Sequence, residues 1–155
     1  KAFQKSVGLN GVGTKAVNAL SEDFLVTAFR EGKSRSATFQ KGQLINETKE
    51  TKTTEQNGTL VSFTPDATVF KNYHFIYEYI ESQLWNYCYL NAGLVINFNG
   101  KRYVSKNGLH DLLSRKTNAD ELRYPIIHLK GDDIEVAITY SKAQYSEEYH
   151  SFVNG

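Results

Sequence analysis

The chain has 155 residues, of which 40% are hydrophobic and 23% charged, and its formal net charge is only +1. This composition is typical of a folded globular protein, and it excludes a disordered chain or a strongly basic nucleic-acid-binding domain. The longest apolar runs, such as residues 94–96, are far shorter than the roughly 20 residues of a membrane-spanning helix, so we expect no membrane insertion.

The first half of the chain predicts a glycine-rich segment, one short helix and several strands. The helix is expected over residues 14–20, with Thr14 as its N-cap. Strands are expected where β-branched and aromatic residues stand between turn residues, over 24–30, 34–40 and 59–63. The first two strands would form a hairpin across Glu31-Gly32-Lys33. The threonine-rich segment 46–57 has no apolar period, which indicates an exposed loop or a weak edge ribbon.

The second half of the chain predicts the longest helix, a hairpin, a short helix and three further strands. Apolar residues recur at helical spacing over 74–91, and Gly93 follows as a stop. Asn99-Gly100 is the strongest hairpin turn in the sequence and joins strands 94–97 and 102–105. Beyond it we expect a short helix over 108–115, a polar connector over 117–123, and strands over 125–130, 134–140 and 149–153. Since βαβ alternation is absent, the predicted fold class is α+β with a mixed or antiparallel sheet.

The methionine and cysteine counts indicate what kind of protein the chain comes from and in which compartment it is expected. Methionine is absent, even at position 1, so we interpret the chain as a cut from a longer protein. The single cysteine, Cys88, excludes an internal disulfide framework and agrees with a reducing compartment, so the expected location is the cytoplasm. Within its helix Cys88 is predicted to be a small buried hydrophobe rather than a nucleophile.

The segment with the clearest chemical meaning is Gly8-Leu9-Asn10-Gly11-Val12-Gly13, which directly precedes a helix. Glycines let backbone N–H groups approach an anion, and the following helix adds its positive N-terminal end, so phosphate is the natural ligand. The glycine order G-x-x-G-x-G is not the dinucleotide-binding fingerprint, and Thr14-Lys15 reverses the order that a P-loop requires. A flexible turn before a helix therefore stays open as the alternative reading of the glycines alone.

Longer motifs extend beyond the glycines and resemble one family. Residues 6–21, SVGLNGVGTKAVNALS, closely resemble the ATP lid of the ATPase subunits of bacterial type IIA topoisomerases, the B subunits of gyrase and topoisomerase IV. The resemblance continues, in order along the chain, through residues 57–66 (NGTLVSFTPD), 90–96 (LNAGLVI), 133–137 (DIEVA) and 149–154 (YHSFVN). It therefore covers nearly the whole chain.

The resemblance implies the second half of a GHKL-type ATPase sandwich over residues 1–104, with the ATP lid at 1–21, and the first strands of a transducer domain over 105–155. It implies that ATP is bound by the lid residues Gly8, Leu9, Asn10, Gly11, Val12 and Gly13, and that Thr59 lies near the adenine pocket. A β-strand threonine without that role is an equal reading of Thr59. Asn10 stands where many members have histidine, and Phe3 stands where a phenol often lies.

The resemblance also implies what the whole protein does. The chemistry would be ATP hydrolysis assisted by Mg²⁺ and coupled to DNA strand passage, with DNA, a second copy of the same subunit and the DNA-cleaving A-type subunit as partners. The water-activating glutamate, the magnesium-binding asparagine and the adenine-reading aspartate of the family would precede Lys1, so the segment alone is expected to be inactive. The sequence does not separate gyrase from topoisomerase IV.

Other chemistries are less well supported by the residues. His110-Asp111 lies beside serines, but adjacent helix residues point to different sides, which favours solvated helix polarity over a hydrolytic set. The four histidines have no i,i+4 pairing, so metal binding is not expected. The alternative function that stays open is a stand-alone, non-enzymatic α+β binding or dimerisation module whose glycine loop is only a hinge.

Overall fold

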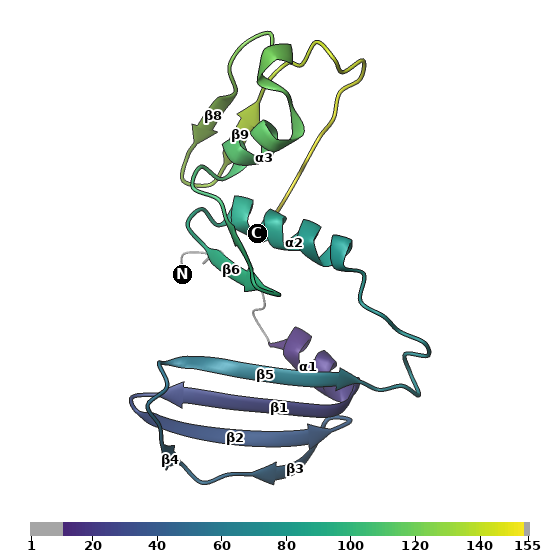
Figure 1. The fold of residues 1–155 in the computed structure, drawn as a ribbon, viewed down its shortest axis with the longest axis vertical. Coiled ribbons are helices and arrows are strands. Elements are labelled where there is room, and N and C mark those ends of the chain that lie inside the picture. Colours follow the sequence, from purple (N-terminus) through teal and green to yellow (C-terminus); the bar gives the residue numbers. More distant parts are fainter. Residues whose placement is uncertain (1–10, 154–155) are drawn as a thin grey trace. The chain divides into compact units, whose positions relative to one another are not determined.

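The computed structural model describes residues 11–153, and its helices and antiparallel strands divide into two compact units, Lys1–His74 and Phe75–Gly155 (Figure 1). The α+β fold class predicted from the sequence is confirmed, because every strand pair in the described residues is antiparallel. The predicted domain boundary after residue 104 lies inside the second unit and stays a prediction.

From residue 11 onward, where the structure describes it, the first unit consists of one helix and a five-stranded sheet. The helix α1 spans Val12–Ala19, and the sheet contains β1 (Ser21–Arg30), β2 (Lys33–Gln40), β3 (Gln43–Glu47), β4 (Thr51–Lys52) and β5 (Gly58–Pro65). The strand order is β3-β2-β1-β5, and β4 pairs with β2. The sheet therefore builds on the long hairpin of β1 and β2, with α1 along the end of β5 (Figure 1).

The turns of this unit follow from local sequence. Glu31 and Gly32 both have positive φ values, 54° and 74°, which close the predicted hairpin of β1 and β2 with a tight turn. Lys41 and Gly42 have φ values of 49° and 80° and repeat this geometry before β3, a strand that the sequence analysis did not predict as such. The segment 46–57, predicted as an exposed loop or a weak edge ribbon, contains the end of β3, the two-residue strand β4 and exposed loop between and after them.

Pairing in the sheet of the first unit gathers aromatic rings on one face. Phe24 lies opposite both Phe39 and Phe63, and directly opposite residues of antiparallel strands share a face. The rings of Phe24 and Phe39 meet edge to face with centroids 6.1 Å apart. Phe24 is the only buried apolar residue described in this unit. The core of this unit is therefore small and is centred on Phe24 within the aromatic row.

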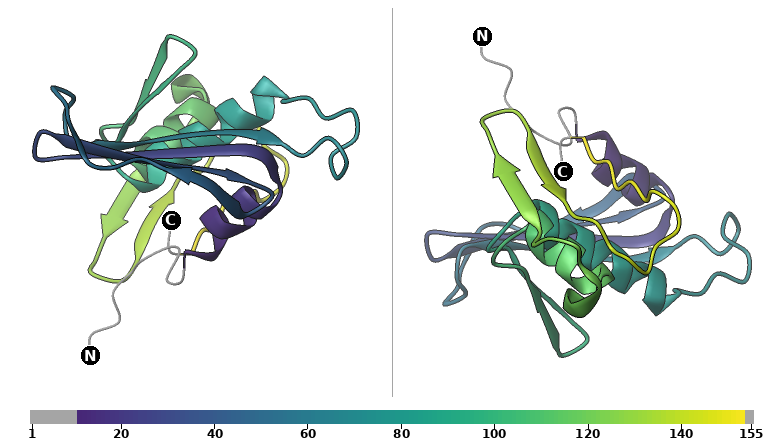
Figure 2. Two further views of the ribbon diagram at one scale, coloured as in Figure 1. Left: turned by 90° about the horizontal axis from the view of Figure 1, so that it is seen from below. Right: turned by 90° about the horizontal axis from the view of Figure 1, so that it is seen from above.

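The second unit contains two α-helices, a short 3₁₀-helix and two hairpins. The helices are α2 (Tyr77–Leu90), α3 (Leu109–Lys116) and η1 (Ala119–Glu121). The first hairpin pairs β6 (Val95–Phe98) with β7 (Lys101–Val104) across the predicted Asn99-Gly100 turn, and the second pairs β8 (Ile127–Lys130) with β9 (Glu135–Ile138). Figure 2 shows the same elements from below and above.

The core of the second unit lies where α2, α3 and β7 meet. Tyr103 and Cys88 are fully buried there, and Trp85 stacks on Tyr89 with ring centroids 5.5 Å apart. The guanidinium of Arg115 lies over the Trp85 ring, 4.3 Å from its centroid, which joins α3 to α2. This packing explains the apolar spacing of the long helix, and it confirms Cys88 as a buried residue.

Two local predictions are wrong. The N-cap of α1 is Gly11 rather than Thr14, so the helix begins two residues earlier and Thr14 lies in its first turn. Residues 149–153 form no strand, although a third antiparallel partner was predicted there. The apolar residues of that segment do not alternate, and polar side chains beside it bond to other side chains, as when Glu148 pairs with Lys116 at 3.1 Å.

Candidate functional site at the N-terminus of α1

The predicted phosphate-binding loop enters the described part of the chain at Gly11. Gly11 is the N-cap of α1 in a left-handed conformation, with φ 62° and ψ 21°, and its carbonyl oxygen accepts a hydrogen bond of 3.3 Å from the Lys15 N–H. A side chain strains such a backbone, so the position favours glycine. Gly8, Leu9 and Asn10, like Phe3, lie outside the described residues, and their roles stay predictions.

The space around the start of α1 is open. A Cβ atom built on Gly11 or Gly13 would meet no atom within 4 Å among the described residues. No described side chain caps the helix, and its first turn carries no acidic residue. The N–H groups of a first helical turn have no partners inside the helix and carry partial positive charge, so this backbone can donate hydrogen bonds to an anion.

Thr59 lies on the β5 strand of the same unit. It pairs with Ala28, and since Phe63 pairs with Phe24 four residues along, Thr59 shares the sheet face of the aromatic row. The end of β5 pairs with Ser21, just after α1. Thr59 comes six positions before Pro65 on this strand, which is a distance of about 20 Å. The structure therefore places Thr59 and α1 in one unit, but Thr59 lies away from the C-terminal end of the helix.

The sequence analysis missed the group of residues that holds the C-terminal end of α1. The Asp66 N–H donates to the Leu20 carbonyl at 2.9 Å, and the Lys41 N–H donates to the Ser21 carbonyl at 2.8 Å. The Ser21 hydroxyl donates back to the Val17 carbonyl at 2.6 Å. Three segments that are distant in sequence thus meet where α1 ends.

The side chain of Asp66 is the centre of this group. Its carboxylate accepts hydrogen bonds from the Thr68 N–H at 2.9 Å and from the Thr68 hydroxyl at 2.8 Å, and it pairs with Lys41 Nζ at 2.8 Å. Asp66 is only 5% exposed. The hydrogen bond from Lys41, followed by those from Thr68, lowers the pKa of Asp66 to about 2. An Asp followed two residues later by Thr predicts this turn from the local sequence. No local pattern predicts that Lys41 pairs with Asp66.

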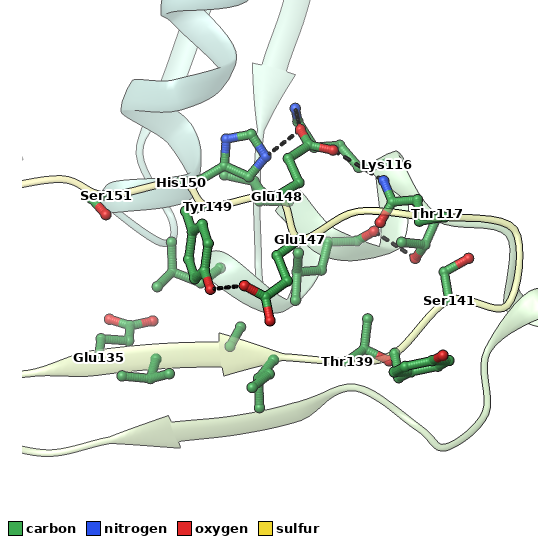
Figure 3. A pocket seen from close by; sticks show the side chains of 18 of the residues that line it. Lys116, Thr117, Glu135, Thr139, Ser141, Glu147, Glu148, Tyr149, His150 and Ser151 are labelled. Atoms are coloured by element: carbon green, nitrogen blue, oxygen red, sulfur yellow. Dashed lines mark hydrogen bonds and ion pairs between the residues drawn. The ribbon is translucent and has the colours of Figure 1, made fainter.

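A separate cavity of about 810 Å³ lies within the second unit, between α3, β9 and residues 141–152 (Figure 3). Glu148, which lines the cavity, pairs with Lys116 at 3.1 Å and with His150 at 2.8 Å, and the Tyr149 hydroxyl donates to Glu147. Gly11, Val12, Gly13 and Thr59, which are the described residues predicted to contact nucleotide, are not among the residues that line this cavity.

The other residues considered in the sequence analysis have structural roles. Asp111 accepts a hydrogen bond of 2.8 Å from Ser105 Oγ in the loop before α3. The same His110 nitrogen, Nδ1, lies 3.4 Å from Ser114 Oγ and 3.9 Å from Asp111 Oδ1, so the ring does not relay between a serine and a carboxylate through its two nitrogens. Burial raises the pKa of the Cys88 thiol, which opposes nucleophilic reactivity. Within residues 11–153, no three His, Cys, Asp or Glu side chains are grouped so that they could hold a metal ion.

Comparison with known proteins finds relatives that match nearly the whole chain. It is 45% identical over 153 residues to the B subunit of DNA topoisomerase 4 from Borreliella burgdorferi, covering 99% of this chain and 25% of that protein. It is 34% identical to the B subunit of DNA gyrase from Helicobacter pylori strain J99, over 98% of this chain and 21% of that protein. No protein-family model matches the chain.

The fold comparison agrees with the sequence comparison. The chain superposes on the 43K ATPase domain of Thermus thermophilus gyrase B, solved in complex with an aminocoumarin, with a TM-score of 0.70 and 28% identity. The match covers 87% of this chain and 40% of that structure. This chain is a homologue of the B subunits of gyrase and topoisomerase IV.

The homology covers a limited part of each relative. The chain spans about a quarter of the length of the Borreliella topoisomerase protein and about a fifth of the Helicobacter gyrase protein. The comparisons confirm the predicted resemblance to the B subunits and the α+β fold. They do not test the contacts of individual lid residues. Among the described helices of this B-subunit homologue, none is long and apolar enough to cross a membrane.

Proposed function

We propose that this chain forms the ATP lid, and part of the relay behind it, of the B-type component of an ATP-dependent type IIA DNA topoisomerase. In this proposal the backbone N–H groups of residues 8–13 bind the phosphates of ATP, and closure of the lid is coupled to dimerisation of two subunits and passage of DNA. Thr59 contributes to the adenine pocket through its hydroxyl group.

The observation that carries the proposal is the open, uncapped start of α1. Gly11 takes a left-handed conformation there, and neither Gly11 nor Gly13 is shielded by any described atom within 4 Å. Among the described residues, no side chain stands in the way of a phosphate group that approaches the N–H donors of the first turn. The homology to topoisomerase B subunits supports the proposal of an anion site at the start of this helix.

The donor set fits phosphate but not a metal ion. Backbone N–H groups donate hydrogen bonds and cannot coordinate a cation, and residues 11–153 contain no metal-binding group of three acidic, His or Cys side chains. We therefore assign Mg²⁺ to parts of the whole protein outside residues 11–153. The contribution of this chain is to orient the phosphates and to neutralise their charge with fixed backbone dipoles.

The remaining parts of the proposal concern the whole protein. We assign residues 1–104 to the ATPase domain and 105–155 to the start of the transducer domain, following the order of the family motifs. The partners are DNA, a second copy of the same protein and the A-type subunit that cleaves DNA. The location is the cytoplasm, where these partners occur.

The substitution Gly11→Val in the full-length protein tests the proposal. Valine strains a backbone with positive φ, and its branched side chain fills the space that the phosphate needs. We expect binding of a non-hydrolysable ATP analogue, measured by titration calorimetry, to fall by at least about tenfold, the scale of one or more lost charged hydrogen bonds.

Gly93→Val is the matched control for this experiment. Gly93 also has positive φ, at 89°, and also has no described atom within 4 Å of a built Cβ, but it lies in the second unit after α2. Backbone strain is therefore comparable in the two variants, whereas only Gly11 belongs to the lid. Unchanged affinity for the analogue in Gly11→Val, or equal loss in both variants, would remove Gly11 from the site.

A further inference from the structure

The C-terminal end of α1 is fixed by contacts from two turns that are distant in sequence. Asp66, just after β5, donates its N–H to the Leu20 carbonyl, and Lys41, in the turn between β2 and β3, donates its N–H to the Ser21 carbonyl. The two side chains then pair with each other at 2.8 Å between Lys41 Nζ and Asp66 Oδ2. Backbone hydrogen bonds thereby join the end of α1 to both turns, and the ion pair joins the two turns to each other.

Packing supports the same arrangement. A Cβ atom built on Gly42 would lie 3.3 Å from the Ala19 Cα atom, so the turn between β2 and β3 presses directly against the last turn of α1. Gly42 has a φ of 80°, which places this turn in a conformation that favours glycine. The backbone of α1 is thus held by close contact as well as by hydrogen bonds.

The geometry of a short helix transmits this restraint to the candidate site. The helix has eight residues, so about 12 Å separate its held end from its start at Gly11. Its first turn is uncapped, and among the described residues its N–H donors depend on the orientation of the helix for their direction. A change in how α1 sits on the sheet therefore changes where those donors point.

We propose that Asp66 is a positioning residue for the ATP lid: by tying the end of α1 to the turn that carries Lys41, it sets the direction of the N–H donors at Gly11–Gly13. This inference rests on the proposed function, because it assigns a role to Asp66 only if the start of α1 binds nucleotide. Asp66 itself lies at the opposite end of the helix and acts through α1.

The sheet does not depend on this ion pair for its register. Seven residue pairs join β1 to β2, and eight join β1 to β5, outside the group around Asp66 except at the Ser21–Pro65 end. Loss of the Asp66 carboxylate should therefore loosen α1 before it disrupts the sheet. This separates a positioning role from a general role in folding.

Two ligands measured on the full-length protein distinguish these roles. A non-hydrolysable ATP analogue reports phosphate contacts together with adenine contacts, whereas adenosine reports only the adenine side. In Asp66→Asn we expect affinity for the analogue to fall about tenfold, the scale of a displaced binding group, and affinity for adenosine to stay within about twofold. Lys41→Gln should act in the same direction, and Lys41→Arg should retain wild-type affinity because it keeps the charge.

Glu47→Gln is the matched control within the same sheet. Glu47 pairs with Arg35 at 2.9 Å and lies on β3, toward the opposite edge of the sheet from β5. The variant therefore also removes one carboxylate charge from an ion pair. Affinity for both ligands should be unchanged. Wild-type affinity for the analogue in Asp66→Asn and Lys41→Gln, or parallel loss of both ligands in these variants, would overturn the positioning role. If the wild-type protein fails to bind the analogue, or Gly11→Val binds it normally, the proposed function itself fails.

Discussion

Asp111 illustrates how one side chain stabilises a local structure that the sequence presents only as a polar helix. Its carboxylate accepts hydrogen bonds from Ser105 Oγ at 2.8 Å, from the N–H groups of Lys106 and Asn107 at 3.1 and 3.0 Å, and from Asn107 Nδ2 at 3.0 Å. Partial burial opposes ionisation, but these hydrogen bonds outweigh it and lower the pKa of Asp111 to about 2. The loop before α3 is therefore closed by an ionised carboxylate.

The lowered pKa makes the stability of this unit sensitive to acid. Because the folded state holds Asp111 ionised, its contribution is complete above the ordinary Asp pKa of 3.8 and is lost as the pH falls toward about 2. We expect Asp111→Asn to unfold more easily at neutral pH, with a difference from wild type that narrows over this range. Chemical unfolding followed by the fluorescence of Trp85, the only tryptophan, measures it.

Asp120→Asn is a suitable control for the acid experiment, because Asp120 is an exposed carboxylate in η1 of the same unit. It should leave the unfolding curve unchanged at each pH. A constant difference between Asp111→Asn and wild type from neutral pH down to about 2 would contradict the assignment of the acid sensitivity to this carboxylate.

At the scale of elements, the second unit depends on the burial of α3. Leu112 is the one buried apolar residue of α3, at 4% exposure, and α3 itself contacts both α2 and the second hairpin. Leu129, on β8 of the same unit, is 63% exposed. The two leucines therefore differ in burial while sharing the same side chain.

This pair gives a direct test of where the core lies. We expect Leu112→Ala to lower the free energy of unfolding by about 2 kcal/mol, since it removes buried apolar surface and leaves a cavity. Leu129→Ala should change it by less than about 0.5 kcal/mol, because most of its side chain is already in water. Denaturant titration monitored by Trp85 fluorescence compares them, and equal effects would place the core elsewhere.

At the scale of the whole molecule, the proposed phosphate-binding N–H groups at the start of α1 have no carboxylate beside them in the first turn of that helix. Glu22 and Asp23 come directly after α1, at its C-terminal end, and Asp23 Oδ1 accepts a hydrogen bond of 3.2 Å from Gln40. The eight residues of α1, about 12 Å, separate these carboxylates from Gly11. Hydrolysis needs a group that orients or activates water beside the phosphate.

We therefore expect the purified 155-residue chain to release phosphate from ATP no faster than the background rate. A coupled phosphate assay with and without Mg²⁺ measures this, and the full-length protein serves as the positive reference. Magnesium-dependent release by the chain alone, abolished by Gly11→Val, would mean that a catalytic carboxylate lies within the segment and that the proposed division of roles is wrong.

Local sequence determined much of the first and second units. Glu31-Gly32 and Asn99-Gly100 closed the predicted hairpins, because dipeptides of this kind adopt positive φ values without help from distant residues. The apolar period of α2 indicated its length to within a few residues. The family motifs, which are also contiguous in sequence, predicted the B-subunit homology that the comparisons confirmed.

Tertiary structure decided the features that depend on distant residues. The group around Asp66 forms only when the turn carrying Lys41 and the end of β5 meet at α1, and no spacing in the sequence shows that meeting. The same holds for residues 149–153, which contain strand-forming residues but follow Glu148, whose side chain pairs with Lys116, and join no strand. Turn and helix signals act over a few residues, whereas ion pairs and sheet edges are settled by which segments the complete fold brings together.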